Sequence, residues 1–225
     1  MKTRDRILKE SLALFNEQGE RNVTTNHIAA HLGISPGNLY YHFRNKADII
    51  YSIFREYRAL VGHYLHVSRD RPLTIRDKMF YLESVFDGLW YYRFFHRDLE
   101  YLLTTDQRLR EAYRDFTFQC LEEVRAVLQG LQLGGILREH SESEQQAMAL
   151  NVWLVVTNWM AFLKTAHGEE GSDDITREQL RQGIYQVLTL EMPYVTEQYL
   201  GEVMELREKY RPQLPEGLGA LERSD

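Results

Sequence analysis

The sequence predicts an all-α protein in which a small N-terminal helical module precedes a larger helical domain. Three observations lead to this fold class. Apolar residues recur at the 3.6-residue period of an amphipathic helix along most of the chain. Glycine, proline and Ser/Thr capping residues divide these stripes into segments of helical length. No stretch alternates apolar and polar residues as a half-buried strand would, and no internal repeat is apparent.

The first three predicted helices are short and well delimited. A stripe of apolar and small residues predicts a first helix of about four turns that ends at Gly19. Thr24 or Thr25 can cap a second helix that ends at Gly33. A third helix must then begin at Ser35-Pro36, which supplies a capping hydroxyl and a proline at the first helical position.

The remaining helices are longer. One is expected from about Lys46 to about His66, and two more stripes run over residues 75–89 and 109–131. Ser143 with Gln146 forms a possible cap for the next helix. That helix is apolar all round over residues 148–163, which predicts burial on both sides because its amides make it a poor membrane span.

Two further helices complete the expected order. Thr176 and Gln179 form a capping box for a helix over residues 177–190. Pro193 separates it from a last helix near 194–210, and residues 211–225 look like a flexible tail.

Composition excludes several classes of protein. The chain has 225 residues, a net charge of -6 and 27% charged residues, which is typical of a soluble protein and unlike a basic nucleic-acid coat. Cys120 is the single cysteine, so an intrachain disulfide and a thiolate metal cage are excluded. The N-terminus lacks the uninterrupted apolar core of a signal peptide. We therefore expect a cytoplasmic protein.

The second and third helices have the spacing of a helix-turn-helix. Gly33-Ile34-Ser35 leaves a three-residue turn between them, and Ala29 is small where crossing helices need room. The second helix of such a unit enters the major groove of DNA, and its N-terminal residues reach base edges first. Here these residues are Ser35, Pro36, Gly37 and Asn38.

The rest of this helix divides between packing and DNA contact. Leu39 and Phe43 are expected to face the module's own core. Tyr40, Tyr41 and His42 offer hydroxyl or imidazole donors suited to phosphate oxygens. Burying these three together would demand several hydrogen-bond partners in a very short helix. Lys46 begins the following helix, where an ammonium could meet the same DNA strand.

The segment VTTNHIAAHLGISPGNLYYHFRNKADII, residues 23–50, resembles the DNA-binding domain of the tetracycline-repressor (TetR/AcrR) family of bacterial transcription regulators. GNLYYHF with a lysine three residues later matches the family signature, and ILKESLALFNEQG resembles its first helix. The resemblance implies a three-helix DNA-binding module followed by a helical domain that binds a small molecule and forms a homodimer. It places DNA contacts at Thr25, Ser35, Gly37, Tyr40, Tyr41, His42 and Lys46.

One position departs from the family pattern. Pro36 stands where many members have lysine, so a cation is missing there and Asn38 becomes the leading candidate for base contact. The charge distribution is consistent with DNA binding by the N-terminal part. Residues 1–50 contain seven Lys and Arg against five Asp and Glu, whereas the remainder is acidic.

These observations predict three parts: a DNA-binding domain over 1–46, a helical regulatory domain over 47–210 and the tail. The expected function is a homodimeric repressor that binds an inverted-repeat operator and is released by a small apolar or amphipathic ligand. The alternative is a DNA-binding regulator that is controlled by a protein partner and has no small-molecule pocket.

Aromatic residues in the regulatory part suggest where a ligand could bind. The candidates for an aromatic-lined pocket are Phe86, Trp90, Tyr91, Phe94, Tyr113, Phe116 and Trp153. The alternative for each is ordinary core packing, which is the commoner role of aromatic stripes at helical spacing. Arg93, Arg97 and Asp98 could select a carboxylate or simply be paired and solvated, and the second interpretation is the commoner case.

A homodimer is expected to form through residues 148–163 and 177–190, because one face of the apolar helix can pack on its own subunit and the other on its mate. Whether the helix near 194–210 joins this interface stays open. The homodimer through the last two main helices is also what the family resemblance implies.

Enzymatic and metal-binding functions have little support. His27 and His31 have the i, i+4 spacing of a shared metal site, but no carboxylate or cysteine nearby completes it. No nucleophile elbow, phosphate loop or dinucleotide motif is present. We expect neither a cofactor nor catalysis.

Overall fold

The computed structural model describes residues 2–66, 71–166 and 175–212. Within these ranges the regular elements are helices, and the one β feature is an isolated bridge between Leu137 and Val195. The predicted all-α fold is therefore confirmed. The chain forms two compact units, the first from Met1–His63 with Tyr91–Thr117 and the second from Tyr64–Trp90 with Phe118–Asp225.

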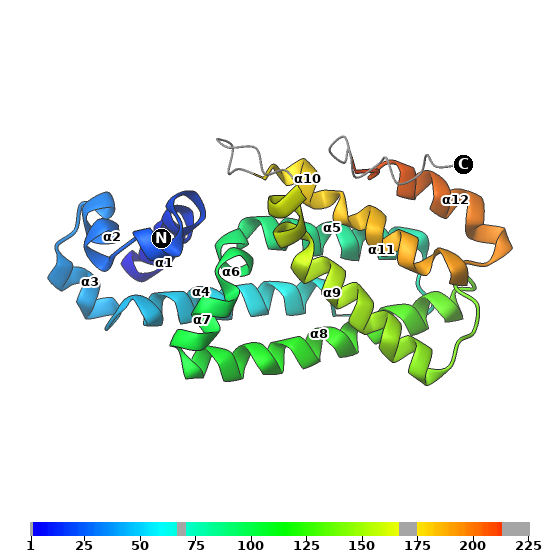
Figure 1. Ribbon diagram of the computed structural model, residues 1–225. Coiled ribbons are helices and arrows are strands. Elements are labelled where there is room, and N and C mark those ends of the chain that lie inside the picture. The colour runs from blue at the N-terminus through cyan, green and yellow to red at the C-terminus, as the bar shows by residue number, and fades with distance from the viewer. Residues whose placement is uncertain (1, 67–70, 167–174, 213–225) are drawn as a thin grey trace. The chain divides into compact units, whose positions relative to one another are not determined.

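This division by packing differs from the boundary predicted at residue 46, because later helices pack with the N-terminal ones. The first unit contains α1 (Thr3–Gln18), the 3-10 turn η1 (Glu20–Asn22), α2 (Thr25–Leu32), α3 (Pro36–His42) and most of α4 (Lys46–Tyr64), followed by α6 (Arg93–Arg97), α7 (Leu99–Thr105) and the start of α8 (Gln107–Leu133). Figure 1 shows α1, α2 and α3 at the blue end of the ribbon. The first helix with its stop at Gly19, and the two short helices after it, are as predicted.

Polar contacts fasten residues 91–98 to α1. The Asn16 side chain donates to the carbonyl of Tyr91 over 2.9 Å and accepts from the backbone N–H of Phe94 over 3.1 Å. The Arg97 guanidinium donates to the carbonyl of Phe15 over 2.6 Å and thereby caps the C-terminus of α1. Asp98 pairs with Arg21 and with Arg97. Arg97 and Asp98 are thus paired within the protein, as one sequence interpretation held, but only 25% and 16% of their side chains are exposed, so they are partly buried and not solvated.

Aromatic rings fill the core of the first unit. The Phe54 ring centre lies 5.5 Å from that of Phe95, 5.9 Å from that of Tyr113 and 5.8 Å from that of Phe116. These spacings are those of ordinary aromatic packing. Phe54, Phe95 and Phe116 are all buried, so helices α4, α6 and α8 share one apolar interior in this unit.

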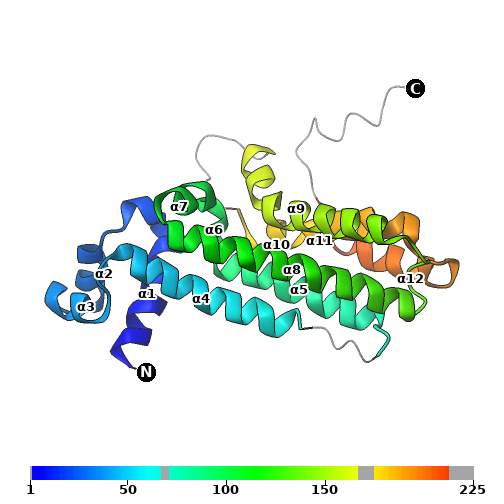
Figure 2. The same cartoon turned by 90° about the horizontal axis from the view of Figure 1, so that it is seen from below.

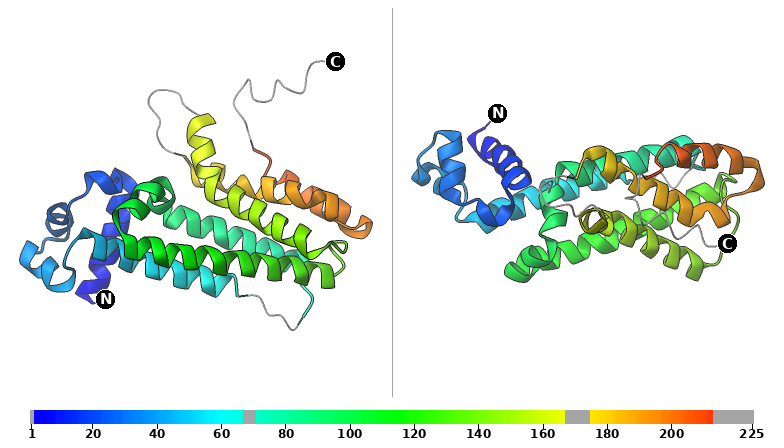
Figure 3. Two further views of the ribbon diagram at one scale, coloured as in Figure 1. Left: turned by 60° about the horizontal axis from the view of Figure 1, so that its bottom comes forward. Right: turned by 45° about the horizontal axis from the view of Figure 1, so that its top comes forward.

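The second unit contains α5 (Ile75–Tyr91) except its last residue, the rest of α8, α9 (Glu142–Ala166), α10 (Arg177–Arg181), α11 (Gly183–Glu191), the 3-10 turn η2 (Met192–Tyr194) and α12 (Glu197–Glu208). In Figures 2 and 3, α11 lies beside both α9 and α12, and these helices are in contact. The single helix predicted over 177–190 is wrong in one respect, because it divides into α10 and α11 at Gln182. The capping box of Thr176 with Gln179 is confirmed.

The start of α9 also differs from its prediction. Ser141, not Ser143, caps the helix: its hydroxyl accepts from the backbone N–H of Glu144 over 3.3 Å, and the Glu144 carboxylate accepts from the Ser141 N–H over 2.7 Å. The expected pair, Ser143 and Gln146, has the three-residue spacing of a capping box, but Ser141 and Glu144 have the same spacing and form the reciprocal bonds two residues earlier.

By length and composition, α9 is the one helix in the described part of the chain that could cross a membrane. Met148, Val152, Trp159 and Leu163 are nevertheless buried in the core of the second unit. Its opposite face is open, with Leu150 47% and Leu154 48% exposed. Burial on both sides, as the sequence predicted, is therefore not achieved by a single chain.

One buried ion pair crosses this core. The Lys78 ammonium of α5 contacts the Glu191 carboxylate of α11, and both side chains are almost fully buried. Position 134 requires glycine because the backbone of Leu73 approaches it closely: a Cβ on Gly134 would overlap the carbonyl oxygen of Leu73. The loop before α5 and the end of α8 are thus tightly joined.

Candidate nucleic-acid interface

Local capping defines the two short helices. The Thr24 hydroxyl accepts from the backbone N–H of His27 over 3.2 Å at the start of α2. Gly33 ends α2 in the left-handed conformation, with φ 64° and ψ 31°, which residues with a side chain rarely adopt. The Ser35 hydroxyl caps α3 at the N–H of Asn38, and Pro36 occupies the first turn. The turn of residues 33–35 therefore follows from local chemistry.

The inner face of α3 is anchored in the first unit. Leu39 is fully buried and Phe43 is 4% exposed. On α2, Ile28 and Ala29 are buried as well, with exposures of 0% and 1%. Arg4 lies over the Phe43 ring at 5.0 Å. The predicted packing role of Leu39 and Phe43 is confirmed.

The outer face of α3 is open to solvent. Ser35, Pro36, Gly37 and Asn38 are exposed. Tyr40 is 48% exposed and Tyr41 85%, which is unusual for residues with such large apolar rings. The N-terminus of α3 adds backbone N–H groups and a partial positive charge that favour an anion. This face has the hydroxyls, amide and helix end that phosphate and base contacts require.

Two contacts orient the aromatic residues of this face. The Tyr40 hydroxyl of α3 lies 3.1 Å from the Thr25 hydroxyl at the start of α2. This contact joins one DNA-contact candidate on each helix of the pair. The His42 ring packs edge-on against the Tyr41 ring at 5.1 Å and is partly buried. Pre-ordered side chains lose less conformational entropy when a ligand binds.

Lys46 has a different environment from the other candidates. Its ammonium lies 2.7 Å from a carboxylate oxygen of Glu20 and donates to the carbonyls of Glu20 and Val23 over 3.0 Å each. These three acceptors match the three N–H donors of a lysine ammonium. Its side chain is 28% exposed. In this conformation, Lys46 positions α4 against η1, and its DNA contact stays a prediction.

Arg44 is a further candidate for DNA contact that was not predicted from the sequence. Arg44 lies in the turn between α3 and α4 and is exposed. The sequence could have indicated this role, because Arg44 directly follows the GNLYYHF segment of the predicted DNA-binding helix. A guanidinium at this place is suited to bidentate phosphate contact.

The histidines of α2 take part in structural contacts. His27 Nδ1 lies 3.2 Å from the carbonyl oxygen of Asn22, and His31 Nε2 lies 3.3 Å from a carboxylate oxygen of Glu10. Among the described residues, no group of three or more His, Cys, Asp or Glu side chains could hold a metal.

The seven residues proposed to line a ligand pocket fall in both compact units. Phe86, Trp90 and Trp153 belong to the second unit, whereas Tyr91, Phe94, Tyr113 and Phe116 belong to the first. Phe94, Tyr113 and Phe116 are buried among other rings, and Tyr91 is 52% exposed. A Cβ on Gly183 would lie 2.5 Å from the Phe86 ring, so Phe86 packs tightly. Their role in ligand binding stays a prediction.

A capped helix pair with a buried inner face and an exposed polar-aromatic outer face defines a helix-turn-helix transcription regulator. Two family models match this chain. Residues 7–53 match "Bacterial regulatory proteins, tetR family", and residues 56–203 match "Bacterial transcriptional repressor". The chain belongs to the TetR family of DNA-binding transcriptional regulators.

Individual relatives agree with this assignment. A TetR-family transcriptional regulator from Marinobacter aquaeolei VT8 is 63% identical, with a TM-score of 0.88, and the match covers 94% of this chain and all of that one. An HTH-type transcriptional regulator of Staphylococcus aureus strain USA300 is 37% identical over 68 residues, which is 30% of this chain and 37% of that protein. SmeT, in the structure of its complex with triclosan, has the same fold, with a TM-score of 0.57. It is 18% identical in sequence, and the match covers 87% of this chain and 92% of the SmeT chain.

Proposed function

We propose that this protein is a homodimeric cytoplasmic repressor that binds an inverted-repeat operator through α3. The observation that carries the proposal is the exposure of Pro36, Gly37, Asn38, Tyr40 and Tyr41 above a buried Leu39. A helix held by its inner face presents its outer residues rigidly to a groove. Asn38 is the proposed base-reading residue, because its amide can pair with an adenine edge.

The phosphate contacts are assigned to the flanking residues. Thr25, Ser35, Tyr40, Tyr41 and His42 supply hydroxyl or imidazole groups, Gly37 allows close approach, and Lys46 adds charge at the start of α4. We add Arg44 to this set because it is the exposed cation beside α3. Contacts to phosphates would set the position of the module on DNA without reading sequence.

The dimer is proposed to form through residues 148–163 and 177–190. Leu150, Leu154 and Phe162 leave an apolar face of α9 open in the single chain, at 38–48% exposure. Such a contiguous face is typical of a subunit interface. A two-fold dimer presents two copies of α3, which is the reason for an inverted-repeat operator.

Release by a small apolar or amphipathic ligand is the proposed regulation. Two proteins that share the fold support this regulation. SmeT was solved with triclosan, and a regulator from Saccharomonospora viridis was solved with choline. The tight packing of Phe54, Phe95, Tyr113 and Phe116 favours the alternative of a protein partner for this part of the chain. A ligand-dependent rise in melting temperature would distinguish the two.

Footprinting of the purified protein on the DNA upstream of its own gene tests the central proposal. We expect protection of an inverted repeat by the wild type and about tenfold weaker binding by Tyr41→Ala, since a phosphate contact is lost in each subunit. Phe118→Ala is the matched control, because Phe118 is an aromatic residue of α8 that is 61% exposed. Absence of a protected repeat, or equal loss in both variants, contradicts the proposal.

A further inference from the structure

The start of α1 carries two arginines that have no part in the outer face of α3. Arg4 and Arg6 are both exposed. Residues two positions apart in an α-helix point to nearly opposite sides, because each residue turns the helix by about 100°. The two guanidinium groups therefore reach different segments of the helix-turn-helix, and each has a defined partner there.

Arg6 holds the end of α2. Its guanidinium donates to the carbonyl of Leu32 over 2.7 Å. Leu32 is the last residue of α2, and the last carbonyls of a helix lack an intrahelical donor. The backbone N–H groups of Gly33 and Ile34 donate to carbonyls earlier in α2. A cation at this place is also favoured by the helix dipole. Arg6 thus fixes α2 directly before the turn of residues 33–35.

Arg4 holds the end of α3 against α4. Its guanidinium carbon lies 5.0 Å from the centre of the Phe43 ring, and Phe43 is the residue that closes α3. Its Nη2 donates to the hydroxyl of Ser52 in α4 over 3.2 Å. A planar guanidinium can stack on a ring and donate from its edge at the same time. Arg4 therefore bridges the helices on both sides of the turn at residues 43–45.

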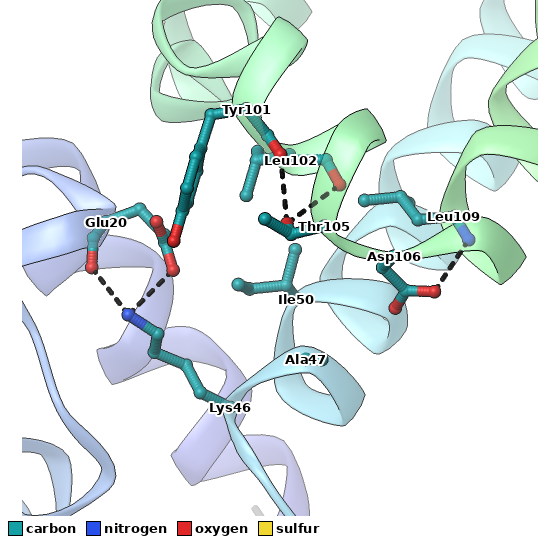
Figure 4. Close-up of a pocket in the computed structure, with 9 residues that line it drawn as sticks. All are labelled: Glu20, Lys46, Ala47, Ile50, Tyr101, Leu102, Thr105, Asp106 and Leu109. Carbon is teal, nitrogen blue, oxygen red and sulfur yellow. Dashed lines mark hydrogen bonds and ion pairs between the residues drawn. The ribbon is translucent and has the colours of Figure 1, made fainter.

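The start of α4 is held by a third contact. Figure 4 shows the Lys46 ammonium joined to Glu20 of η1 at the edge of a small pocket. The segment of residues 33–45 is therefore held at three points by residues that precede it in the chain. Arg6 holds its beginning, Arg4 holds the end of α3, and Glu20 holds the helix that follows.

On its own, α3 is weakly anchored. It spans seven residues, Pro36–His42, of which Leu39 is the buried one. A helix of two turns that is anchored by one side chain can tilt about that anchor. Residues that contact a ligand need neighbours that fix their geometry. Arg4 acts on Phe43, one turn after Leu39, and so limits this tilt.

We propose that Arg4 and Arg6 are positioning residues for DNA binding. They fix the ends of α3 and α2, and thereby the direction in which Asn38 and Tyr41 face. Their guanidinium groups stay on Phe43 and Leu32 when DNA binds. The inference rests on the proposed use of α3 as the DNA-reading helix. It differs from direct contact of either arginine with phosphate, which would add to the salt dependence of binding.

Salt-dependent binding separates positioning from phosphate contact. Arg4→Met and Arg6→Met keep an unbranched stem and remove the guanidinium. Lys9→Met is the matched control, because Lys9 is another exposed cation of α1. Fluorescence anisotropy measures the affinity for a duplex of about 30 base pairs that carries the protected repeat, over a range of salt concentrations. We expect about fivefold weaker binding by each arginine variant, near-wild-type affinity of Lys9→Met, and one salt slope for all four proteins.

Two results of this experiment would overturn the proposal. A slope flatter by about 0.9 or more in an arginine variant would assign that arginine to a phosphate. An affinity equal to that of Lys9→Met would leave the arginine without a role in DNA binding. Arg6→Lys retains a cation and a donor at the Leu32 carbonyl, so it should restore the binding that Arg6→Met loses. Failure to restore it would overturn the assignment of Arg6.

Hydrogen exchange in the absence of DNA tests the hold on α3 independently of any operator. The backbone N–H of Leu39 donates to the carbonyl of Ser35, and that of Phe43 to the carbonyl of Leu39. In Arg4→Met we expect both to exchange about fivefold faster, while the buried Phe15 of α1 keeps its wild-type rate. Unchanged rates, or equal acceleration at Phe15, would overturn the proposal. If no repeat is protected, the proposed operator binding fails, and these rates still decide whether Arg4 holds α3.

Discussion

The Lys46 ammonium lies 2.7 Å from a carboxylate oxygen of Glu20, so the first residue of α4 is fastened to the η1 turn 26 residues earlier. Glu20 is almost fully buried, whereas Lys46 keeps 28% of its side chain exposed. This pair joins the end of the α1 region to the helix that follows α3. It also fixes the position from which α3 is presented.

Lys46→Met should lower the free energy of unfolding by about 2–4 kcal/mol, because it leaves a buried carboxylate without its cation. The partial exposure of Lys46 puts the value at the lower part of this range. Urea denaturation followed by circular dichroism measures the effect. Arg44→Met, an exposed neighbour, should change stability by less than about 0.5 kcal/mol. Equal stability of Lys46→Met and wild type would show that the pair contributes nothing.

Pro36→Lys should strengthen binding to DNA of any sequence. Pro36 is exposed at the start of α3, and its replacement adds a cation next to the proposed phosphate contacts. Each new phosphate contact steepens the plot of log affinity against log salt concentration by about 0.9. Fluorescence anisotropy with a random duplex of about 30 base pairs measures this slope. A cation on α12, Gly201→Lys, is the control, and an equal slope in both variants would contradict the placement of Pro36.

The helix-turn-helix could be predicted from the sequence because its determinants are local. Thr24, Gly33 and Ser35 act within three or four residues along the chain, so their spacing alone delimits α2 and α3. The burial of Leu39 followed from its place on the inner face. These positions needed no knowledge of the rest of the fold.

The remainder depended on contacts between distant residues. Arg97 caps α1 at Phe15, 82 positions earlier in the chain, and the residues next to Arg97 in the sequence do not indicate that partner. Lys46 was expected to face DNA, but its ammonium is taken by acceptors 23 and 26 residues earlier. The aromatic run near residue 90 continues without a break in the sequence, yet Trp90 and Tyr91 belong to different compact units. Periodicity reports which residues are buried but not which neighbours they have.

Leu154→Glu should dissociate the proposed dimer. Leu154 is 48% exposed on the open face of α9, and a carboxylate there would be desolvated in a two-fold interface opposite its own copy. We expect a wild-type dimer and a monomeric variant in sedimentation equilibrium at micromolar concentration. Leu200→Glu on α12, where Leu200 is 37% exposed, tests whether that helix joins the interface. A Leu154→Glu protein that stays dimeric would move the interface away from α9.

The His96 imidazole should make stability depend on pH between about 6.5 and 4. Its Nε2 lies 3.0 Å from the Tyr57 hydroxyl, and burial lowers the pKa of His96 to about 4, so the folded protein holds it neutral. An unfolded histidine has a pKa of about 6.5 and therefore binds more protons than the folded one between these values. The free energy of unfolding should fall as the pH drops from about 6.5 to about 4, by at most about 3 kcal/mol from this group. His96→Gln keeps a neutral polar group beside Tyr57 and removes that component, whereas His66→Gln at an exposed position should retain it. Urea titrations at half-unit pH steps compare the three proteins, and a parallel decline in wild type and His96→Gln would show that His96 is not the group responsible.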